Sequence, residues 1–208
     1  MTIGRLHVIT DVSIQSRFTH EEVAELACQG GADVVQLRDK SLGDDDFLKI
    51  ARRIAAICRR YEVTFIVNDR VEIAREVGAG VHLGRDDSSV SDARTVLGPK
   101  AIIGTSTGSV EAARAAETSG ADYLGFGHIF PTTSKQKETR AVGVELLAAV
   151  AHQSPLPVIA IGGITESNAA RVMSSAAWGI AVIGAVCGSD DPRAATERLR
   201  VIVDRFAD

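Results

Sequence analysis

Short apolar runs alternate with amphipathic segments along the chain, and this alternation constrains the fold more than any other feature of the sequence. Each run ends in polar residues or glycine, and a helical pattern follows it. Strands that alternate with helices form parallel sheets, and eight such units in 208 residues predict closure into a barrel. The sequence therefore predicts fold class α/β, as one (βα)₈ TIM-barrel domain over residues 1–208. The predicted strands are Leu6–Thr10, Val34–Leu37, Thr64–Val67, Gly80–Leu83, Ala101–Gly104, Tyr123–Gly127, Val158–Ile161 and Gly179–Ile183.

The segments between these runs carry signals of helices and of the turns that end them. Residues 47–58 place apolar side chains at helical spacing, and the Thr-His-Glu-Glu of residues 19–22 predicts a capping box. Gly-Ala-Asp at 31–33 and at 120–122 predicts helix-ending turns that lead into strands. An open doubly wound sheet is the alternative, but its first turn would carry G-x-G-x-x-G, and this sequence does not.

Composition narrows the class of partner. The net charge is -4 and no run of lysine and arginine occurs, which argues against a nucleic-acid partner. No signal peptide is recognisable, and no apolar run approaches the roughly 20 residues that span a bilayer. The three cysteines, Cys28, Cys58 and Cys187, are isolated, which is typical of reduced residues in a cytoplasmic protein. We therefore expect a cytoplasmic protein with small-molecule substrates, and the sequence leaves a homo-oligomer open.

Polar residues and glycines gather where most of the predicted strands end. In (βα)₈ barrels the active site lies at the carboxyl ends of the strands, so these positions are the candidate site. In strand order, from the second strand to the eighth, they are Gln36, Arg38 and Lys40; Asn68 and Asp69; Arg85, Asp86 and Asp87; Ser106; His128, Thr132, Ser134 and Lys135; Gly162 and Gly163; and Gly184.

Gln36, Arg38 and Lys40 alternate with other residues, so the period of a strand would turn all three to one face. Two cations on the inward face of a barrel need an anion to offset their desolvation. A bound anionic ligand would supply it. The alternative is a salt-bridge network at the rim with Asp39, Asp69 or Asp87, and the residues alone leave both open.

Asp69 and Asp87 follow neighbouring predicted strands, beside these cations. Mg²⁺ in proteins typically takes one or two carboxylates together with phosphate oxygens of a substrate. The pair therefore predicts a Mg²⁺ site, whereas we interpret Asp86 as a cap of the next helix.

Two further segments suit phosphate. Thr132, Ser134 and Lys135 offer hydroxyls and an ammonium, and the glycines after the last two strands expose backbone N–H groups where this fold often binds a phosphate monoester. Among the five histidines, only His128 falls at a strand end with these candidates. We interpret the other four, His7, His20, His82 and His152, as structural.

Together these residues resemble the thiamine-phosphate synthase family, which shares its fold with TenI-type thiazole tautomerases. The resemblance runs essentially end to end, and it rests on five stretches: Gln36–Lys40, Val67–Arg70, Val81–Asp87, Gly125–Lys135 and Ile161–Thr165. It implies coupling of hydroxymethylpyrimidine diphosphate to hydroxyethylthiazole phosphate, with release of diphosphate and with Mg²⁺ as cofactor.

The resemblance also implies a role for each candidate. Asp69 and Asp87 would hold Mg²⁺, and Gln36 and Ser106 would contact substrate near the reaction centre. Gly162, Gly163 and Gly184 would bind the thiazole phosphate through backbone N–H groups. The diphosphate would be held by Arg38, Lys40, Asn68, Thr132, Ser134 and Lys135.

Three departures from the family pattern keep alternatives open. The family often carries Gly-x-Ser-x-His after the fifth strand, and here Gly108 replaces that histidine. His128 stands where many synthases have proline, and a tautomerase would use it to move a proton. Gly184 stands where a serine is common. The alternatives are a metal-free thiazole tautomerase, a catalytically silent binding or regulatory relative, and another phosphate-binding barrel enzyme such as a sugar-phosphate epimerase.

Overall fold

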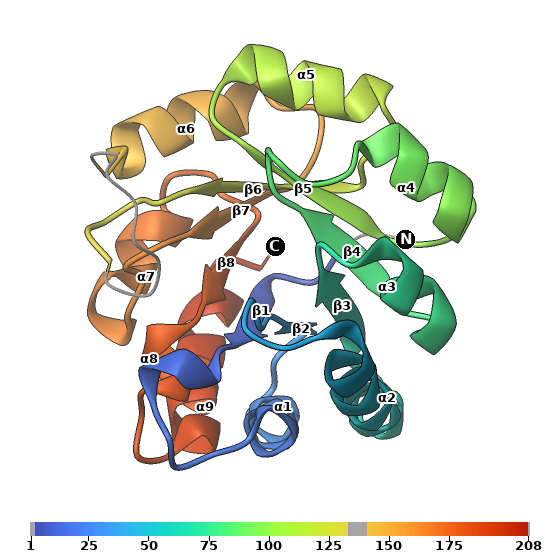
Figure 1. The fold of residues 1–208 in the computed structure, drawn as a ribbon. Helices are drawn as coiled ribbons and strands as arrows, with labels where there is room; N and C mark the ends of the chain where they lie inside the picture. The colour runs from blue at the N-terminus through green and yellow to red at the C-terminus, as the bar shows by residue number, and fades with distance from the viewer. Residues whose placement is uncertain (1–2, 133–140, 208) are drawn as a thin grey trace.

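Eight parallel strands form a closed barrel in the computed structural model, which describes residues 3–132 and 141–207 (Figure 1). Each strand pairs with the next in the sequence, and β8 pairs with β1 through Ala181 beside His7. The predicted (βα)₈ barrel is therefore confirmed. The strands are β1 Leu6–Thr10, β2 Val34–Leu37, β3 Thr64–Asn68, β4 Gly80–Leu83, β5 Ile103–Thr107, β6 Tyr123–Gly127, β7 Val158–Ile161 and β8 Gly179–Val182.

Helices surround this barrel and cover its outer face (Figure 1). The capping box predicted at residues 19–22 opens α1, with the Thr19 side chain accepting from the Glu22 N–H. No helix in the described part of the chain is both long and apolar enough to cross a membrane. The helical elements are η1 Val12–Ile14, α1 His20–Gln29, α2 Asp44–Arg60, α3 Val71–Val77, α4 Val90–Leu97, α5 Val110–Thr118, α6 Gly143–Gln153, α7 Glu166–Met173, α8 Gly184–Cys187 and α9 Pro192–Asp204.

The fifth strand differs most from its prediction. It was expected at 101–104 and runs over Ile103–Thr107, whereas the other seven match to within one residue. The polar end of the strand is stabilised by bonds to neighbouring residues: Thr105 donates to the Leu83 carbonyl at 3.2 Å, and Thr107 donates to the Ser109 carbonyl at 3.0 Å. The prediction from the apolar run ended too early, because the strand continues through two threonines whose hydroxyls have hydrogen-bond partners.

The two Gly-Ala-Asp segments fasten the amino ends of the strands. Gly31 and Gly120 take positive φ values of 87° and 91° in the predicted helix-ending turns, which glycine adopts readily. Asp33 then accepts from the N–H groups of Arg5 and Leu6, each at 2.8 Å. Asp122 accepts from the N–H of Ile103 at 2.7 Å. Each aspartate thus holds the start of the strand that precedes its own in the barrel.

Candidate active site

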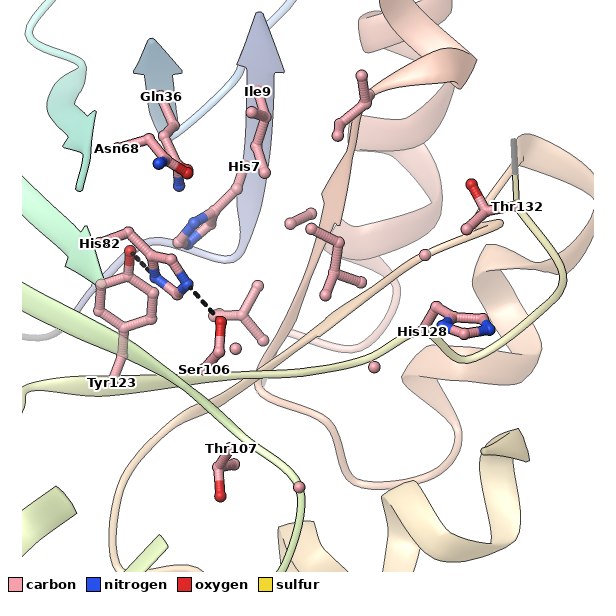
Figure 2. Close-up of a pocket in the computed structure, with 18 of the residues that line it drawn as sticks. His7, Ile9, Gln36, Asn68, His82, Ser106, Thr107, Tyr123, His128 and Thr132 are labelled. Carbon is pink, nitrogen blue, oxygen red and sulfur yellow. Dashed lines mark hydrogen bonds between the residues drawn. The ribbon is translucent and has the colours of Figure 1, made fainter. Parts of the chain in front are cut away.

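A cavity of about 280 Å³ extends from the inside of the barrel to the loops beyond the carboxyl ends of the strands. All eight strands, or the residues directly after them, contribute to its wall. Figure 2 shows part of this wall, with Gln36, Ser106 and His128 among its labelled side chains. It contains seven of the residues predicted from the sequence: Gln36, Asn68, Arg85, Ser106, His128, Thr132 and Gly162. The remaining lining residues include His7, His82, Thr107, Gly108, Tyr123, Gly125 and several aliphatic side chains.

A second hollow adjoins this cavity between the ends of β7 and β8. It shares Thr132 and Gly162 with the cavity and adds Gly163 and Gly184. The predicted glycines of the last two strands therefore meet in one place. Ser134 and Lys135, which were predicted beside them, lie outside the described residues.

Gly162 and Gly163 are required by their surroundings. Both have positive φ values, 100° and 66°. A Cβ at Gly162 would lie 2.2 Å from the Cβ of His128, and a Cβ at Gly163 would lie 2.5 Å from the Pro131 carbonyl oxygen. Only glycine allows this close approach of the β7 end to the segment after β6, and that approach forms the wall of the second hollow.

The predicted triplet of Gln36, Arg38 and Lys40 does not share one face. Only Gln36 lines the cavity, because β2 ends at Leu37 and the strand period stops there. The Arg38 guanidinium contacts the carboxylate of Asp11, and the Lys40 ammonium contacts the carboxylate of Asp69. The Lys40 pair is one that the rim-network alternative predicted. Asp11, which directly follows β1, was not among the sequence candidates.

Arg38 keeps one hydrogen-bond donor unused. Its side chain is only 16% exposed, and Asp11 opposite it is 5% exposed. Within the described part of the chain, the buried Nε of Arg38 has no hydrogen-bond partner. A buried donor of this kind normally has an acceptor, so an anion bound beside Arg38 would satisfy it.

The loop that carries Lys40 is held at several points. Asp39 accepts from the Ser41 N–H at 2.7 Å and contacts His20, which is buried and also bonds Thr10. Burial raises the pKa of Asp39, but the bonds from Ser41, His20 and Leu42 outweigh it and lower this pKa to about 2. The expectation that His20 is structural agrees with these contacts.

Arg70 holds the same loop from its other side. It donates to the Leu42 carbonyl at 2.6 Å and lies over the Phe47 ring, 4.1 Å from its centre. Lys40 therefore projects from a loop whose backbone is fixed, which limits where its ammonium can lie.

The two predicted metal ligands follow neighbouring strands. Asp69 comes directly after β3, and its N–H donates to the His82 carbonyl of β4 at 2.9 Å. Asp87 follows β4, and its carboxylate accepts from the Gly84 N–H at 2.6 Å. Asp86 does not cap α4, contrary to our prediction, because Ser89 occupies the N-cap and accepts from Asp92.

This pair suits a hard cation only together with other oxygen ligands. Over residues 3–132 and 141–207, no group of three or more histidine, cysteine, aspartate or glutamate side chains could hold a metal ion. Two carboxylates with phosphate oxygens of a substrate are a set that Mg²⁺ accepts.

Two histidines that the sequence analysis assigned to structure line the cavity. The ring of His82 bonds Ser106 through Nε2 and Tyr123 through Nδ1, each at 3.1 Å (Figure 2). The Nε2–H of His7 donates to the Gly4 carbonyl at 3.0 Å, and burial lowers the pKa of His7 to about 4. A polar residue inside a predicted barrel strand is a signal that could have revealed both.

The comparisons with known proteins agree along almost the whole chain. Residues 6–186 match the family model described as thiamine monophosphate synthase. The chain is 43% identical to the thiamine-phosphate synthase of Salinibacter ruber, with 98% of this chain and 90% of the relative covered. It is 44% identical to the thiamine-phosphate synthase of Methanocella arvoryzae, with 97% and 95% covered.

A solved structure shows the same likeness in three dimensions. The thiamine phosphate pyrophosphorylase of Pyrococcus furiosus superposes with a TM-score of 0.89 at 40% identity, with 98% of this chain and 97% of that chain covered. The resemblance noted in the sequence is thereby confirmed: the chain belongs to the thiamine monophosphate synthase family.

Proposed function

We propose that this protein is a thiamine-phosphate synthase, a transferase that joins hydroxymethylpyrimidine diphosphate to hydroxyethylthiazole phosphate and releases diphosphate. The observation that carries the proposal is a pair of adjoining hollows at the carboxyl ends of the strands. One has polar side chains on a largely apolar wall and is large enough for a heterocycle, and the other is lined by glycines that suit a phosphate. The synthase names of the relatives support the same reaction.

The reaction exchanges one bond for another. The bond between the pyrimidine methylene carbon and the diphosphate oxygen breaks, and the diphosphate leaves with the electron pair. The resulting carbocation is stabilised by its own ring, and the thiazole nitrogen then forms the new carbon–nitrogen bond. Because the coupling itself needs no proton transfer, the protein mainly positions the reactants and balances charge.

The diphosphate would bind beside the cations of the β2 end. Arg38 contributes a buried Nε–H with no partner in the described part of the chain. Lys40 contributes an ammonium on a fixed loop, and Asn68 and Thr132 contribute polar groups of the cavity wall. Ser134 and Lys135 complete the proposed set.

Asp69 and Asp87 would hold Mg²⁺. When bound, the ion supplies positive charge for the departing diphosphate. The protein's own part is to place the two carboxylates: the Gly84 N–H fixes Asp87, and the Lys40 ammonium contacts Asp69.

The substrates' other ends would lie deeper in the barrel and in the second hollow. Gln36 and Ser106 would contact the pyrimidine near the reacting carbon, because both lie on the cavity wall. Gly162, Gly163 and Gly184 would bind the thiazole phosphate through backbone N–H groups. Three buried free cysteines, Cys28, Cys58 and Cys187, support a cytoplasmic location for this chemistry.

His128 supports a second candidate, a thiazole tautomerase. Its imidazole lines the cavity, where it could act as general acid and base. The purified protein, supplied with both thiamine precursors and Mg²⁺, is expected to form thiamine phosphate and diphosphate. If it forms neither, but isomerises the thiazole carboxylate phosphate in EDTA, the synthase proposal is wrong and the tautomerase stands.

A further inference from the structure

A continuous line of hydrogen bonds runs through the cavity wall from β6 to β4 and on to β5. The Tyr123 hydroxyl lies 3.1 Å from Nδ1 of His82, and Nε2 of His82 lies 3.1 Å from Oγ of Ser106 (Figure 2). All three side chains line the cavity, and the reaction as proposed uses only Ser106. Tyr123 and His82 therefore need an explanation of their own.

Two glycines make room for the rings of this line. A Cβ at Gly104 would lie 2.1 Å from the Tyr123 ring, and a Cβ at Gly125 would lie 2.9 Å from Cε1 of His82. Gly125 pairs with Ser106 in the barrel, and Gly104 pairs with Tyr123. The barrel backbone thus fits closely around both rings and sets their positions.

The direction of the bonds follows from Tyr123. Its side chain is buried, and burial raises the pKa of its hydroxyl, so the phenol keeps its proton. Within the described residues its one hydrogen-bond partner is Nδ1 of His82. A buried O–H is rarely left without an acceptor, so Tyr123 donates to Nδ1.

The bond from Tyr123 to Nδ1 determines where the proton of the His82 ring lies. Since Nδ1 accepts, the neutral imidazole of His82 carries its proton on Nε2, and Nε2–H donates to Ser106. The nearby His7 does not change the pattern, because its Nε2–H donates to Gly4 and its ring meets Tyr123 by an edge, with centres 5.5 Å apart.

We propose that His82 is a positioning residue which, held in one tautomer by Tyr123, turns the hydroxyl proton of Ser106 into the cavity. Ser106 then presents a donor, and the substrate atom it contacts is an acceptor. This assignment rests on the proposed function: in the pyrimidine substrate the acceptor is a ring nitrogen, because the exocyclic amino group is a donor.

The tautomer can be measured without substrate. In protein labelled with ¹⁵N in its imidazoles, two-dimensional NMR distinguishes a protonated ring nitrogen from an unprotonated one, and the spectrum of His82→Gln identifies the His82 signals. We expect protonation at Nε2 in the wild type and a mixture of tautomers in Tyr123→Phe. A His82 protonated at Nδ1 in the wild type overturns the proposal, whether or not the protein makes thiamine phosphate.

A double-mutant cycle tests the action through Ser106. Ser106→Ala and His82→Met should each lower kcat by about tenfold, the effect of one hydrogen bond to the reacting system, and the double variant should be no slower than either. His82→Gln should recover most of kcat, because its amide N–H can donate where Nε2–H did. KM for the thiazole phosphate should stay unchanged throughout.

The possible outcomes separate the role of His82 from the proposed function. If the two single losses multiply in the double variant, or if His82→Met keeps full kcat, His82 does not act through Ser106. If His82→Met does not fold, the comparison of His82→Gln with Ser106→Ala and the wild-type tautomer still decide. If no variant and no wild-type protein makes thiamine phosphate while the tautomer is as expected, the proposed function fails and the proton assignment stands.

Discussion

The Lys40 ammonium lies against the Asp69 carboxylate, so an ion pair joins the loop after β2 to the end of β3. In the proposed function the two partners serve different ligands, with Lys40 on the diphosphate and Asp69 on Mg²⁺. When the ion pair opens, diphosphate would replace the negative charge that Lys40 loses, and Mg²⁺ would replace the positive charge that Asp69 loses. If Mg²⁺ and diphosphate bind as proposed, Lys40 and Asp69 would exchange partners and neither would be left without a compensating charge.

Lys40→Ala is expected to impair the reaction without unfolding the protein. Loss of one preorganised charge should cost on the order of 2–4 kcal/mol of transition-state stabilisation. The Lys40 side chain is 54% exposed, so its ion pair should contribute no more than about 1 kcal/mol to stability. Steady-state kinetics and urea unfolding measure the two effects, with the exposed Lys49→Ala as the control. Unchanged turnover in Lys40→Ala would exclude a diphosphate at this position.

Arg38→Ala is expected to lower stability as well as activity. Removal of Arg38 leaves the buried Asp11 carboxylate without its cationic partner, and breaking a buried ion pair in this way typically costs about 3–5 kcal/mol. The double variant Arg38→Ala with Asp11→Asn should regain part of this stability, yet it should remain inactive. Equal urea midpoints for wild type and Arg38→Ala would show that the Asp11 pair carries no net stability.

Asp87 and Asp86 form a matched pair for testing the metal site. Asp87→Asn should lower thiamine phosphate formation by about a hundredfold or more, the effect of losing charge stabilisation at a departing group. EDTA should reduce wild-type activity to a similar level. Asp86 is exposed, does not cap α4 and should tolerate the same change. A fully active Asp87→Asn variant argues against a carboxylate-bound metal.

His128→Ala should retain a substantial fraction of thiamine phosphate formation, because ring coupling moves no proton. A tautomerase shows the opposite, since imidazole is suited to the proton transfer it performs. Assaying both reactions on wild type and His128→Ala separates the two activities. Loss of isomerase activity alone would show that the cavity supports both reactions, with His128 needed for one.

Acid should begin to destabilise the protein through His7 at a higher pH than that at which most carboxylates titrate. Burial lowers the pKa of His7 from 6.5 to about 4, although the bond to Gly4 and the charge of Asp33 act in the other direction. A histidine with a lowered folded-state pKa contributes stability that is fully present above pH 6.5. That stability is lost as the pH falls toward 4, and the total is about 3 kcal/mol.

Urea unfolding at a series of pH values measures this contribution. The slope between pH 6.5 and 4 should flatten in His7→Gln and persist in the control His152→Gln, whose side chain is exposed. Asp39 titrates at lower pH, because its folded-state pKa is about 2, so it does not account for this window. A wild-type protein equally stable at pH 7 and pH 4.5 would contradict the prediction.

Periodicity predicted the barrel because each strand is a separate local signal, whereas some of the site depends on partners that are distant in sequence. Arg38 lies 27 residues from Asp11, and His82 lies 24 residues from Ser106 and 41 from Tyr123. The polar character of His82 inside a predicted strand could have placed it in the cavity wall, but nothing in the local pattern indicates these partners, so the residue was interpreted as structural. Asp11, in contrast, could have been predicted, because it directly follows β1 and polar residues at strand ends were the criterion used for the other strands.

The alternation of side chains along β2 also predicted the wrong directions for the side chains of Arg38 and Lys40. Arg38 and Lys40 continue the alternation of β2 in sequence, but the strand ends at Leu37 and the backbone turns. Their directions are set by Asp11 and Asp69, two carboxylates from other strand ends. Periodicity predicts side-chain direction only within a regular element, and active-site loops lie beyond it.

The carboxylates that fasten the amino ends of the strands have a consequence for how this protein could be redesigned. Asp33 and Asp122 stabilise the barrel from the end opposite the loops that carry Lys40, Asp69 and Asp87. Substitutions in those loops leave these bonds intact. New specificities could therefore be selected from libraries confined to the carboxyl-end loops, while the amino end preserves the scaffold on which selection acts.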